Sequence, residues 1–117
     1  MPIILTIKKE LIMKAQVISL TESNYLQETS GRLCLLDFYA DWCGPCRKQS
    51  PILEELAAVL GDKALIGKID VDKAPNLARK FGVKSIPTLV TMRNSQQIKR
   101  FVGFQDLSTL KDALRHE

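Results

Sequence analysis

Two cysteines three positions apart define the chemistry that this sequence can perform. Cys43 and Cys46 enclose a Gly-Pro dipeptide, directly after an apolar, β-prone run that ends at Ala40. A helix-forming stretch follows them, which places the pair at a strand-to-helix turn. There the unpaired backbone N–H groups and the positive end of the helix dipole can stabilise a thiolate. A pair in this position could exchange disulfides, bind a metal ion or attach a haem.

The rest of the sequence argues against the metal and haem alternatives. A structural zinc site needs four ligands, usually from two such cysteine pairs. The other candidate ligands are Cys34, inside an apolar run, and His116, near the end of the chain. Covalent haem attachment requires histidine at position 47, where Arg47 stands. We therefore expect no metal ion, a redox function for the pair, and a structural role for Cys34 as a small buried hydrophobic residue.

Asp37 is the second residue that could take part in the chemistry of the site. It lies six residues before Cys43, inside the near-continuous apolar run of residues 33–39. Burial raises the pKa of a carboxyl group, so Asp37 could take up a proton near neutral pH. The alternative is a carboxylate at the end of the sheet that faces solvent. Lys68, in the next apolar segment, is the expected partner, because an unpaired buried carboxylate is costly.

Length and composition describe one ordinary globular domain. The chain has 117 residues, of which 45% are hydrophobic and 26% charged, sufficient for one hydrophobic core. The net charge of +4 is spread along the chain, with at most two basic residues adjacent. This pattern favours a solvated mixed surface over a nucleic-acid site. No stretch of the sequence approaches the ~20 apolar residues of a membrane span, and three cysteines are too few for a disulfide scaffold.

The first residues differ from the rest of the chain. An apolar run of five or six residues precedes Lys8 and Lys9, which is the reverse of the order in a secretory signal, and no small-x-small cleavage site follows. Met13 could be an alternative start. We expect residues 1–14 to be a loosely ordered extension and residues 15–117 to be the folded domain, with the cytoplasm as its compartment.

The order of apolar patterns predicts an α/β fold. Strands are expected at 15–20, 33–39, 64–72, 87–92 and 97–103, and helices after residues 21–23, at 43–60, at 75–80 and after Asp106 or Ser108. The segment 33–39 is typical of a central strand covered on both faces. The short link at 93–96 requires an antiparallel hairpin. Together these elements imply a central mixed sheet of five strands with four helices on its two faces.

The motif Trp-Cys-Gly-Pro-Cys at residues 42–46 resembles the active-site signature of the thioredoxin family. The similarity extends over roughly a hundred residues and includes Asp37, Lys68, the turn at 86–88 and Gly103 at the family's spacings. A lone Cys-x-x-Cys is a weak signal, whereas this combination is specific. The resemblance implies the thioredoxin fold, a central mixed five-stranded sheet flanked by four helices.

The resemblance also implies roles for the reactive residues. Cys43 would be the nucleophile that attacks a substrate disulfide, and Cys46 would be the thiol that resolves the mixed disulfide. Asp37 would act as the general base for Cys46, through a water molecule, with Lys68 beside it. Tyr39 departs from the family, in which tryptophan is common at this position, but no catalytic role depends on it.

A docking surface is the second implication of the resemblance. On base rates the bond before Pro87 would be trans, but the family has a cis bond there that leaves the Ile86 backbone free to pair with an extended substrate. Gly103 would let a partner chain approach closely because it has no side chain. The complete flat apolar surface would comprise Trp42, Gly44, Pro45, Ile86, Pro87 and Gly103. Trp42 could instead be only a packing residue.

A protein with these properties is expected to be a monomeric protein-disulfide reductase. Its own redox group would be the Cys43–Cys46 pair, and its partners would be disulfide-containing clients and a thioredoxin reductase, not nucleic acid or a membrane. NADPH and FAD would belong to that reductase, since the chain has no nucleotide-binding motif. Two alternatives stay open: a reductase or isomerase specialised for an oxidising compartment, and a docking subunit whose thiols are incidental.

Overall fold

The computed structural model of this chain describes residues 16–115. The elements follow one another as β1 (Ile18–Leu20), α2 (Tyr25–Thr29), β2 (Leu33–Tyr39), α3 (Gly44–Leu60), a 3-10 turn (Gly61–Lys63), β3 (Leu65–Asp70), α4 (Pro75–Lys80), β4 (Thr88–Arg93), β5 (Gln96–Val102) and α5 (Leu107–Arg115). Their order agrees with the sequence-based prediction. The predicted extension of residues 1–14, the boundary at residue 15 and His116 lie outside the described residues.

The five strands form one mixed sheet in the order β1-β3-β2-β4-β5. Strands β1, β3 and β2 are parallel, whereas β4 runs antiparallel to β2 and β5 antiparallel to β4. Strand β2 is therefore central and hydrogen-bonded on both edges, as its near-continuous apolar sequence predicts. The mixed five-stranded sheet and four helices of the predicted fold class are confirmed.

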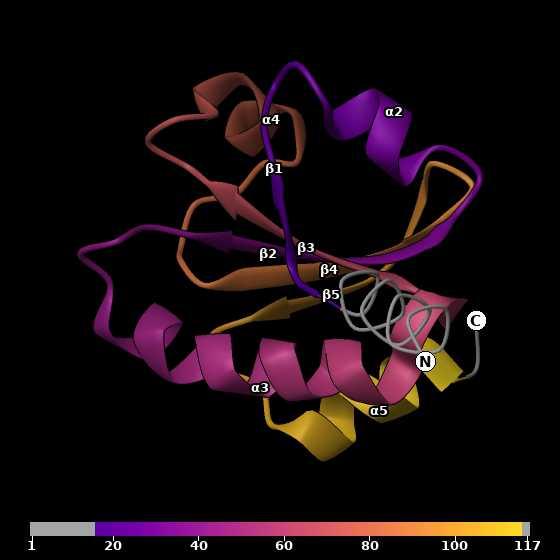
Figure 1. Cartoon of the computed structure of the whole chain (residues 1–117). Coiled ribbons are helices and arrows are strands. Elements are labelled where there is room, and N and C mark those ends of the chain that lie inside the picture. Colours follow the sequence, from indigo (N-terminus) through magenta and orange to yellow (C-terminus); the bar gives the residue numbers. More distant parts are fainter. Residues whose placement is uncertain (1–15, 116–117) are drawn as a thin grey trace, which may run out of the picture.

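Helices cover both faces of the sheet. Figure 1 shows α3 and α5 on one face and α2 and α4 on the other. Alternation along β2 divides its side chains between two cores: Cys34, Leu36 and Phe38 contribute to the core under α2 and α4, and Leu35 to the core under α3 and α5. Because successive side chains of a strand point to opposite faces, Asp37 belongs to the α3 face. A carboxyl group is thus placed beneath the helix that follows the two cysteines.

Polar side chains form a turn ahead of α2 and a cap at the start of α5. The sequence predicts a helix cap from residues 21–23, but α2 begins only at Tyr25. The Thr21 hydroxyl accepts a hydrogen bond from the Asn24 N–H at 3.2 Å and closes a separate turn ahead of the helix. At α5, Asp106 Oδ1 accepts a hydrogen bond from the Thr109 N–H at 2.8 Å. Asp106 is therefore the cap of α5, which settles the choice between Asp106 and Ser108.

The hairpin between β4 and β5 turns on two residues in the left-handed region. Asn94 has φ = 50° and Ser95 has φ = 67°, and the flanking pair is Arg93 with Gln96. Two positive φ angles in a two-residue loop define a type I′ turn, whose twist matches that of the strands. The antiparallel hairpin that the short link at 93–96 predicts is therefore confirmed.

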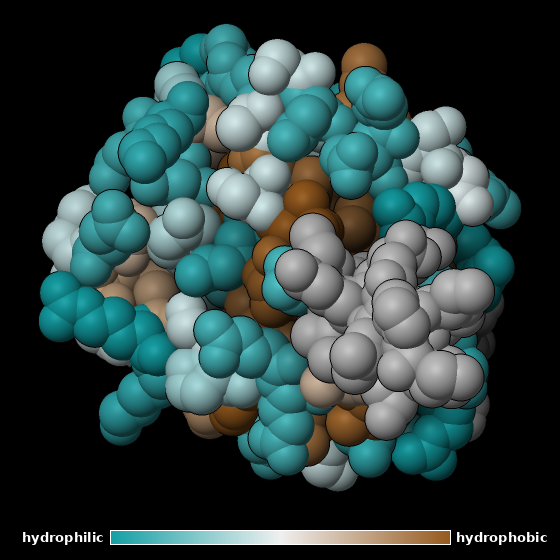
Figure 2. Space-filling model, in the orientation of Figure 1, coloured by the Kyte–Doolittle hydropathy of each residue, from teal (hydrophilic) through white to brown (hydrophobic). Residues whose placement is uncertain are grey.

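The outer surface is mixed in character. On the face that Figure 2 shows, hydrophilic residues cover most of the surface, and hydrophobic residues gather near the centre of the view. No helix within residues 16–115 is long and apolar enough to cross a membrane.

Candidate active site

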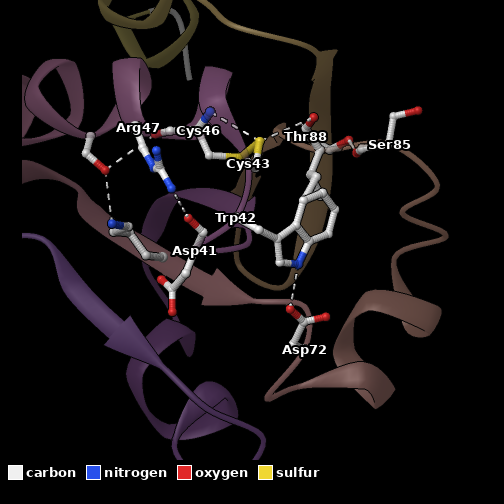
Figure 3. Close-up of a disulfide and its surroundings, with 11 residues drawn as sticks. Asp41, Trp42, Cys43, Cys46, Arg47, Asp72, Ser85 and Thr88 are labelled. Atoms are coloured by element: carbon white, nitrogen blue, oxygen red, sulfur yellow. Dashed lines mark hydrogen bonds between the residues drawn. A yellow bond between two sulfur atoms is a disulfide. The ribbon is translucent and has the colours of Figure 1, made fainter.

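The cysteine pair lies where β2 gives way to α3. Cys43 is the N-cap of α3 with an extended backbone, and the Gly-Pro dipeptide forms the first positions of the helix. Cys46 lies in the first turn, and a disulfide joins the two residues, whose Cα atoms are 5.3 Å apart. Both are buried, with exposed fractions of 5% for Cys43 and 3% for Cys46. The redox-active pair is thus assembled by local sequence at a helix N-terminus (Figure 3).

The helix N-terminus acts on the sulfur of Cys43. The Cys46 N–H donates to Cys43 Sγ at 3.3 Å, and it is one of the N–H groups that have no partner within the helix. A donor in this position favours the thiolate over the thiol, because it stabilises negative charge on sulfur. The same Sγ atom lies 3.9 Å from the carbonyl oxygen of Ile86. The sulfur of Cys43 thus lies between a backbone donor of the helix and the backbone of Ile86.

Asp37 is fully buried beneath this helix. Its exposed fraction is 0%, and neither carboxyl oxygen has a hydrogen-bond partner among residues 16–115. Burial raises the pKa of Asp37 from its ordinary value to about 7, and the positive charge of Lys68 opposes part of that rise. This burial excludes the alternative in which Asp37 faces solvent at the end of the sheet. Asp37 can therefore exchange a proton near neutral pH.

Lys68 is a neighbour of Asp37, but it forms no hydrogen bond with it. The two residues are directly paired in the register of β2 and β3, as expected of partners. The Lys68 ammonium instead donates to Ser50 Oγ at 3.1 Å and lies 4.3 Å from the centroid of the Tyr39 ring. Lys68 is thus the neighbour of Asp37 in the adjacent strand that the sequence predicts, and it acts on the carboxyl group through its charge, while its ammonium group contacts Ser50 and Tyr39.

Replacing Lys68 by methionine should therefore raise the pKa of Asp37 above about 7. The substitution removes the one positive charge that favours the ionised carboxylate, while the buried stem is largely kept. The measurement is a pH titration of the Asp37 carboxyl carbon by NMR. Lys48→Met, on the exposed side of α3, is the matched control and should leave the titration unchanged. A lower pKa in Lys68→Met would contradict this assignment.

A small pocket opens beside the second cysteine. It has a volume of about 190 Å³ and is lined by Tyr39, Ala40, Asp41, Cys46, Arg47, Ser50 and Lys68. The Ser50 hydroxyl donates to the Cys46 carbonyl oxygen at 3.5 Å, so the wall of the pocket is polar on the side of the helix. Water can enter a pocket of this size and polarity next to Cys46.

The segment at 86–88 lies against the cysteine pair. The bond between Ile86 and Pro87 is cis, as the family resemblance implies. Ile86 is half-buried and Pro87 is buried. The N–H of Ile86 has no hydrogen-bond partner among the residues that the structure describes. The residue with this unpaired donor is the one whose carbonyl oxygen lies 3.9 Å from Cys43 Sγ.

Gly103 completes this edge of the site. Its N–H donates to the Pro87 carbonyl oxygen at 2.7 Å, which joins the end of β5 to the cis-proline segment. Its φ is +97°, and a Cβ built on it would meet no atom within 4 Å. The backbone conformation is therefore a sufficient reason for glycine here. The sequence suggested a different reason for glycine at this position, the close approach of a partner chain. That reason stays a prediction, and the open space around Gly103 is compatible with it.

Trp42 covers the outer side of the pair without being part of a core. Its exposed fraction is 69%, so the alternative of a simple packing residue does not describe it. Its indole N–H donates to Asp72 Oδ2 at 3.0 Å (Figure 3). Gly44 and Pro45 are also exposed. Three of the predicted docking residues therefore offer accessible surface around the disulfide.

The third cysteine is separate from the site. Cys34 is fully buried in β2, and burial raises the pKa of its thiol to about 11. It behaves as the small core residue that the sequence predicts. Within residues 16–115, no group of three or more histidine, cysteine, aspartate or glutamate side chains is arranged to hold a metal ion.

Several polar residues at the site were missed by sequence reasoning. They are Gln49, Ser50, Asp72 and Gln105. A signal existed for Gln49, which precedes Leu53 and Leu56 by four and seven positions and so falls on the buried stripe of α3. No comparable signal marks Ser50 or Asp72, since each contacts a residue of another element.

The fold and the site define a class of protein: a thiol–disulfide oxidoreductase with a dithiol at a helix N-terminus and a buried carboxyl group beneath it. Comparison with known proteins agrees with this class. The family profile described as Thioredoxin matches residues 16–116. This chain belongs to the thioredoxin family, and its reaction is the reduction of protein disulfides by thiol–disulfide exchange.

Individual relatives cover nearly the whole chain. Thioredoxin of Staphylococcus haemolyticus is 42% identical over 98 residues, which span 84% of this chain and 94% of the relative. Thioredoxin of Bacillus subtilis is 42% identical over 96 residues, or 82% and 92% of the two chains. Among solved structures, a thioredoxin from Malassezia sympodialis has a TM-score of 0.78 at 34% identity, covering 86% of this chain and 90% of its own. A mutant thioredoxin from Halobacterium salinarum NRC-1 has a TM-score of 0.77 at 36% identity, covering 88% and 91%.

Proposed function

We propose that Cys43 is the attacking thiol of this reductase and Cys46 the resolving thiol. The Cys43 thiolate attacks one sulfur of the client disulfide, forming a mixed disulfide and releasing one client thiolate. Cys46 then loses its proton, and its thiolate attacks Cys43 Sγ. The Cys43–Cys46 disulfide forms, the second client thiolate leaves and takes up a proton, and two electrons have passed to the client.

Asp37 is the proton acceptor for Cys46 in this proposal. The supporting observation is its buried carboxyl group, which has no hydrogen-bond partner among residues 16–115 and a pKa of about 7. A base whose pKa lies near the working pH is suited to this step. The transfer runs through water. The pocket beside Cys46 offers room for water on the side of that thiol, and Lys68, which lines the pocket, is paired in register with Asp37. Lys68 favours the ionised form of Asp37, which is the form that accepts the proton of Cys46. Asp37 then passes this proton to solvent and returns to the carboxylate.

Clients dock on the predicted surface around the disulfide. Its members are Trp42, Gly44, Pro45, Ile86, Pro87 and Gly103. The unpaired N–H of Ile86 supports pairing with the backbone of an extended client segment, next to the Cys43 sulfur that attacks the client disulfide. The exposed indole of Trp42 supplies apolar contact area at the edge of this surface.

The cellular setting completes the proposal. The protein acts as a monomer in the cytoplasm, where thiols are kept reduced. A thioredoxin reductase that carries FAD and oxidises NADPH restores the dithiol after each cycle. The family membership supports this assignment, because a disulfide reductant needs a continuous supply of electrons.

Replacing Cys46 by serine should trap clients as mixed disulfides on Cys43. The attacking thiol is kept, but no thiol remains within reach to release the client, because Cys34 is buried in the core. The measurement is non-reducing electrophoresis of Cys46→Ser after incubation with oxidised insulin, with and without dithiothreitol. The double variant Cys43→Ser, Cys46→Ser is the control and should form no adduct. Adducts of equal amount on both variants would contradict the proposed roles.

A further inference from the structure

Gln49, like Thr91, is a fully buried polar side chain outside the reactive residues. It lies in α3, three residues after Cys46, and its exposed fraction is 0%. A glutamine amide has a donor group and an acceptor group, and burying either without a partner is unfavourable. The position therefore has to be explained by what the side chain binds.

A single distant residue satisfies both ends of the Gln49 amide. Gln49 Nε2 donates to the Gln105 carbonyl oxygen at 2.9 Å, and Gln49 Oε1 accepts from the Gln105 N–H at 2.9 Å. Two hydrogen bonds to the N–H and C=O of one residue fix both its position and its orientation, much as pairing with a neighbouring strand does. Gln49 thus attaches the backbone of Gln105 to the helix that carries the dithiol.

Gln105 belongs to an irregular segment, the 103–106 loop, between β5 and α5. Phe104 of this loop is 41% exposed, so it contributes little apolar anchoring. Gln105 Nε2 donates to the Gly103 carbonyl oxygen at 3.3 Å, and the Gly103 N–H donates to the Pro87 carbonyl oxygen. Hydrogen bonds therefore hold this loop, and they run from α3 to the cis-proline segment.

The chain of contacts ends next to the reactive sulfur. Pro87 follows Ile86, whose carbonyl oxygen lies 3.9 Å from Cys43 Sγ. The helix that carries Cys43 and Cys46 and the backbone proposed to receive the client are thus joined twice: directly at the sulfur, and through Gln49, the 103–106 loop and Gly103. A shift of that loop would move the docking edge relative to the dithiol.

We infer that Gln49 is a positioning residue for client docking, which holds the 103–106 loop so that Gly103 and the Ile86–Pro87 segment stay aligned with Cys43. The inference rests on the docking surface of the proposed function and adds a residue that none of the reactive steps uses. It specifies the client as an extended polypeptide segment that is recognised through hydrogen bonds to its backbone. Small disulfides need no such alignment.

The test compares three substrates in single-turnover reactions of the reduced protein. The first is an extended peptide that carries a disulfide, and the second is the same peptide with an N-methyl group on the residue beside its cysteine. The methyl group removes the client N–H that would donate to the Ile86 carbonyl oxygen, and its bulk hinders approach of the client backbone to the Ile86 N–H. The third is cystamine, which is too small to span the docking edge. Gln49→Met, similar in length but unable to form the two hydrogen bonds, is compared with the wild type.

The wild type should reduce the unmethylated peptide about tenfold faster than the methylated one, the size expected from a lost backbone hydrogen bond. Gln49→Met should lose most of this preference through a slower reaction with the unmethylated peptide. Its rate with cystamine should stay within about twofold of the wild-type rate, because the reactive thiols keep their local geometry. A slower reaction with the peptide together with an unchanged rate with cystamine distinguishes a loss of docking alignment from a general loss of structure.

Two controls keep the outcome interpretable. Leu53→Ala, a buried change in the same helix, provides a destabilised variant that keeps both hydrogen bonds and should retain the peptide preference. Gln49→Leu provides a second substitution in case Gln49→Met fails to fold. Retention of the full wild-type preference in the folded Gln49 variant would overturn the inference. Absence of any preference in the wild type would instead overturn the backbone-docking part of the proposed function.

Discussion

Cys43→Ser is expected to abolish the reduction of protein disulfides, lowering the rate of insulin reduction at least about 1000-fold. Cys43 is the thiol at the N-cap of α3, where the Cys46 N–H supports negative charge on its sulfur. A serine hydroxyl is far less acidic than a thiol and cannot form a disulfide. The measurement is turbidimetric insulin reduction with dithiothreitol as the electron source, so that no reductase has to be identified.

The other cysteines cannot replace Cys43. Cys34 is fully buried, and its pKa is raised to about 11, so almost none of it is thiolate at neutral pH. Cys46 lies within the first turn of α3, whereas Cys43 is at the N-cap. Cys34→Ala is therefore the matched control, and its rate should stay within about twofold of the wild-type rate provided that it folds. Residual activity of Cys43→Ser above one tenth of the wild-type rate would show that another thiol initiates the reaction.

Asp37→Asn is expected to change the way in which stability depends on pH. In the folded protein the pKa of Asp37 is about 7, against an ordinary value of 3.8. As the pH rises from 4 to 7, the unfolded chain gives up this proton while the folded protein retains it. The folded state therefore binds more protons in this window, and the wild-type free energy of unfolding falls, by on the order of 4 kcal/mol.

The asparagine side chain does not titrate between pH 4 and pH 8, so the variant should not show this fall in the free energy of unfolding. Relative to the wild type, Asp37→Asn should gain on the order of 4 kcal/mol of stability between pH 4 and pH 8. Urea unfolding of the disulfide form at pH 4, 6 and 8 measures this change, whatever constant difference the amide introduces. Asp62→Asn, an exposed change on the 3-10 turn, is the control. A difference that is constant across the three pH values would contradict a raised pKa at Asp37.

The same variant should slow the resolution of the mixed disulfide. Without a carboxylate to accept the proton of Cys46, resolution at pH 7 should be about tenfold slower or more. The two proteins should converge at high pH, where Cys46 can lose its proton directly to solvent. Stopped-flow measurement of client release after rapid formation of the mixed disulfide tests this step. Equal rates at pH 7 would remove Asp37 from the proton route and leave its stability effect intact.

Much of the fold and of the active site could be predicted from local sequence patterns. The apolar segment at 33–39 predicted the central strand, and the glycine at position 61, with φ = 58°, ends the active-site helix where the pattern stops. Cys43 at the helix N-terminus and Asp37 within the strand also followed from neighbours along the chain. These features depend on alternation, helix periodicity and helix ends, which are set by residues a few positions apart.

Long-range contacts governed the features that sequence reasoning missed or misjudged. Lys68 lies beside Asp37 as expected, but the contacts of its ammonium group with Ser50 and Tyr39 were not predicted. Gln49 binds the backbone of Gln105, 56 positions away along the chain. The fate of a polar side chain depends on which donors and acceptors folding brings within about 3 Å of it. Chain order thus identified the dithiol and its buried carboxyl group, whereas packing of separate elements selected the partners that position them.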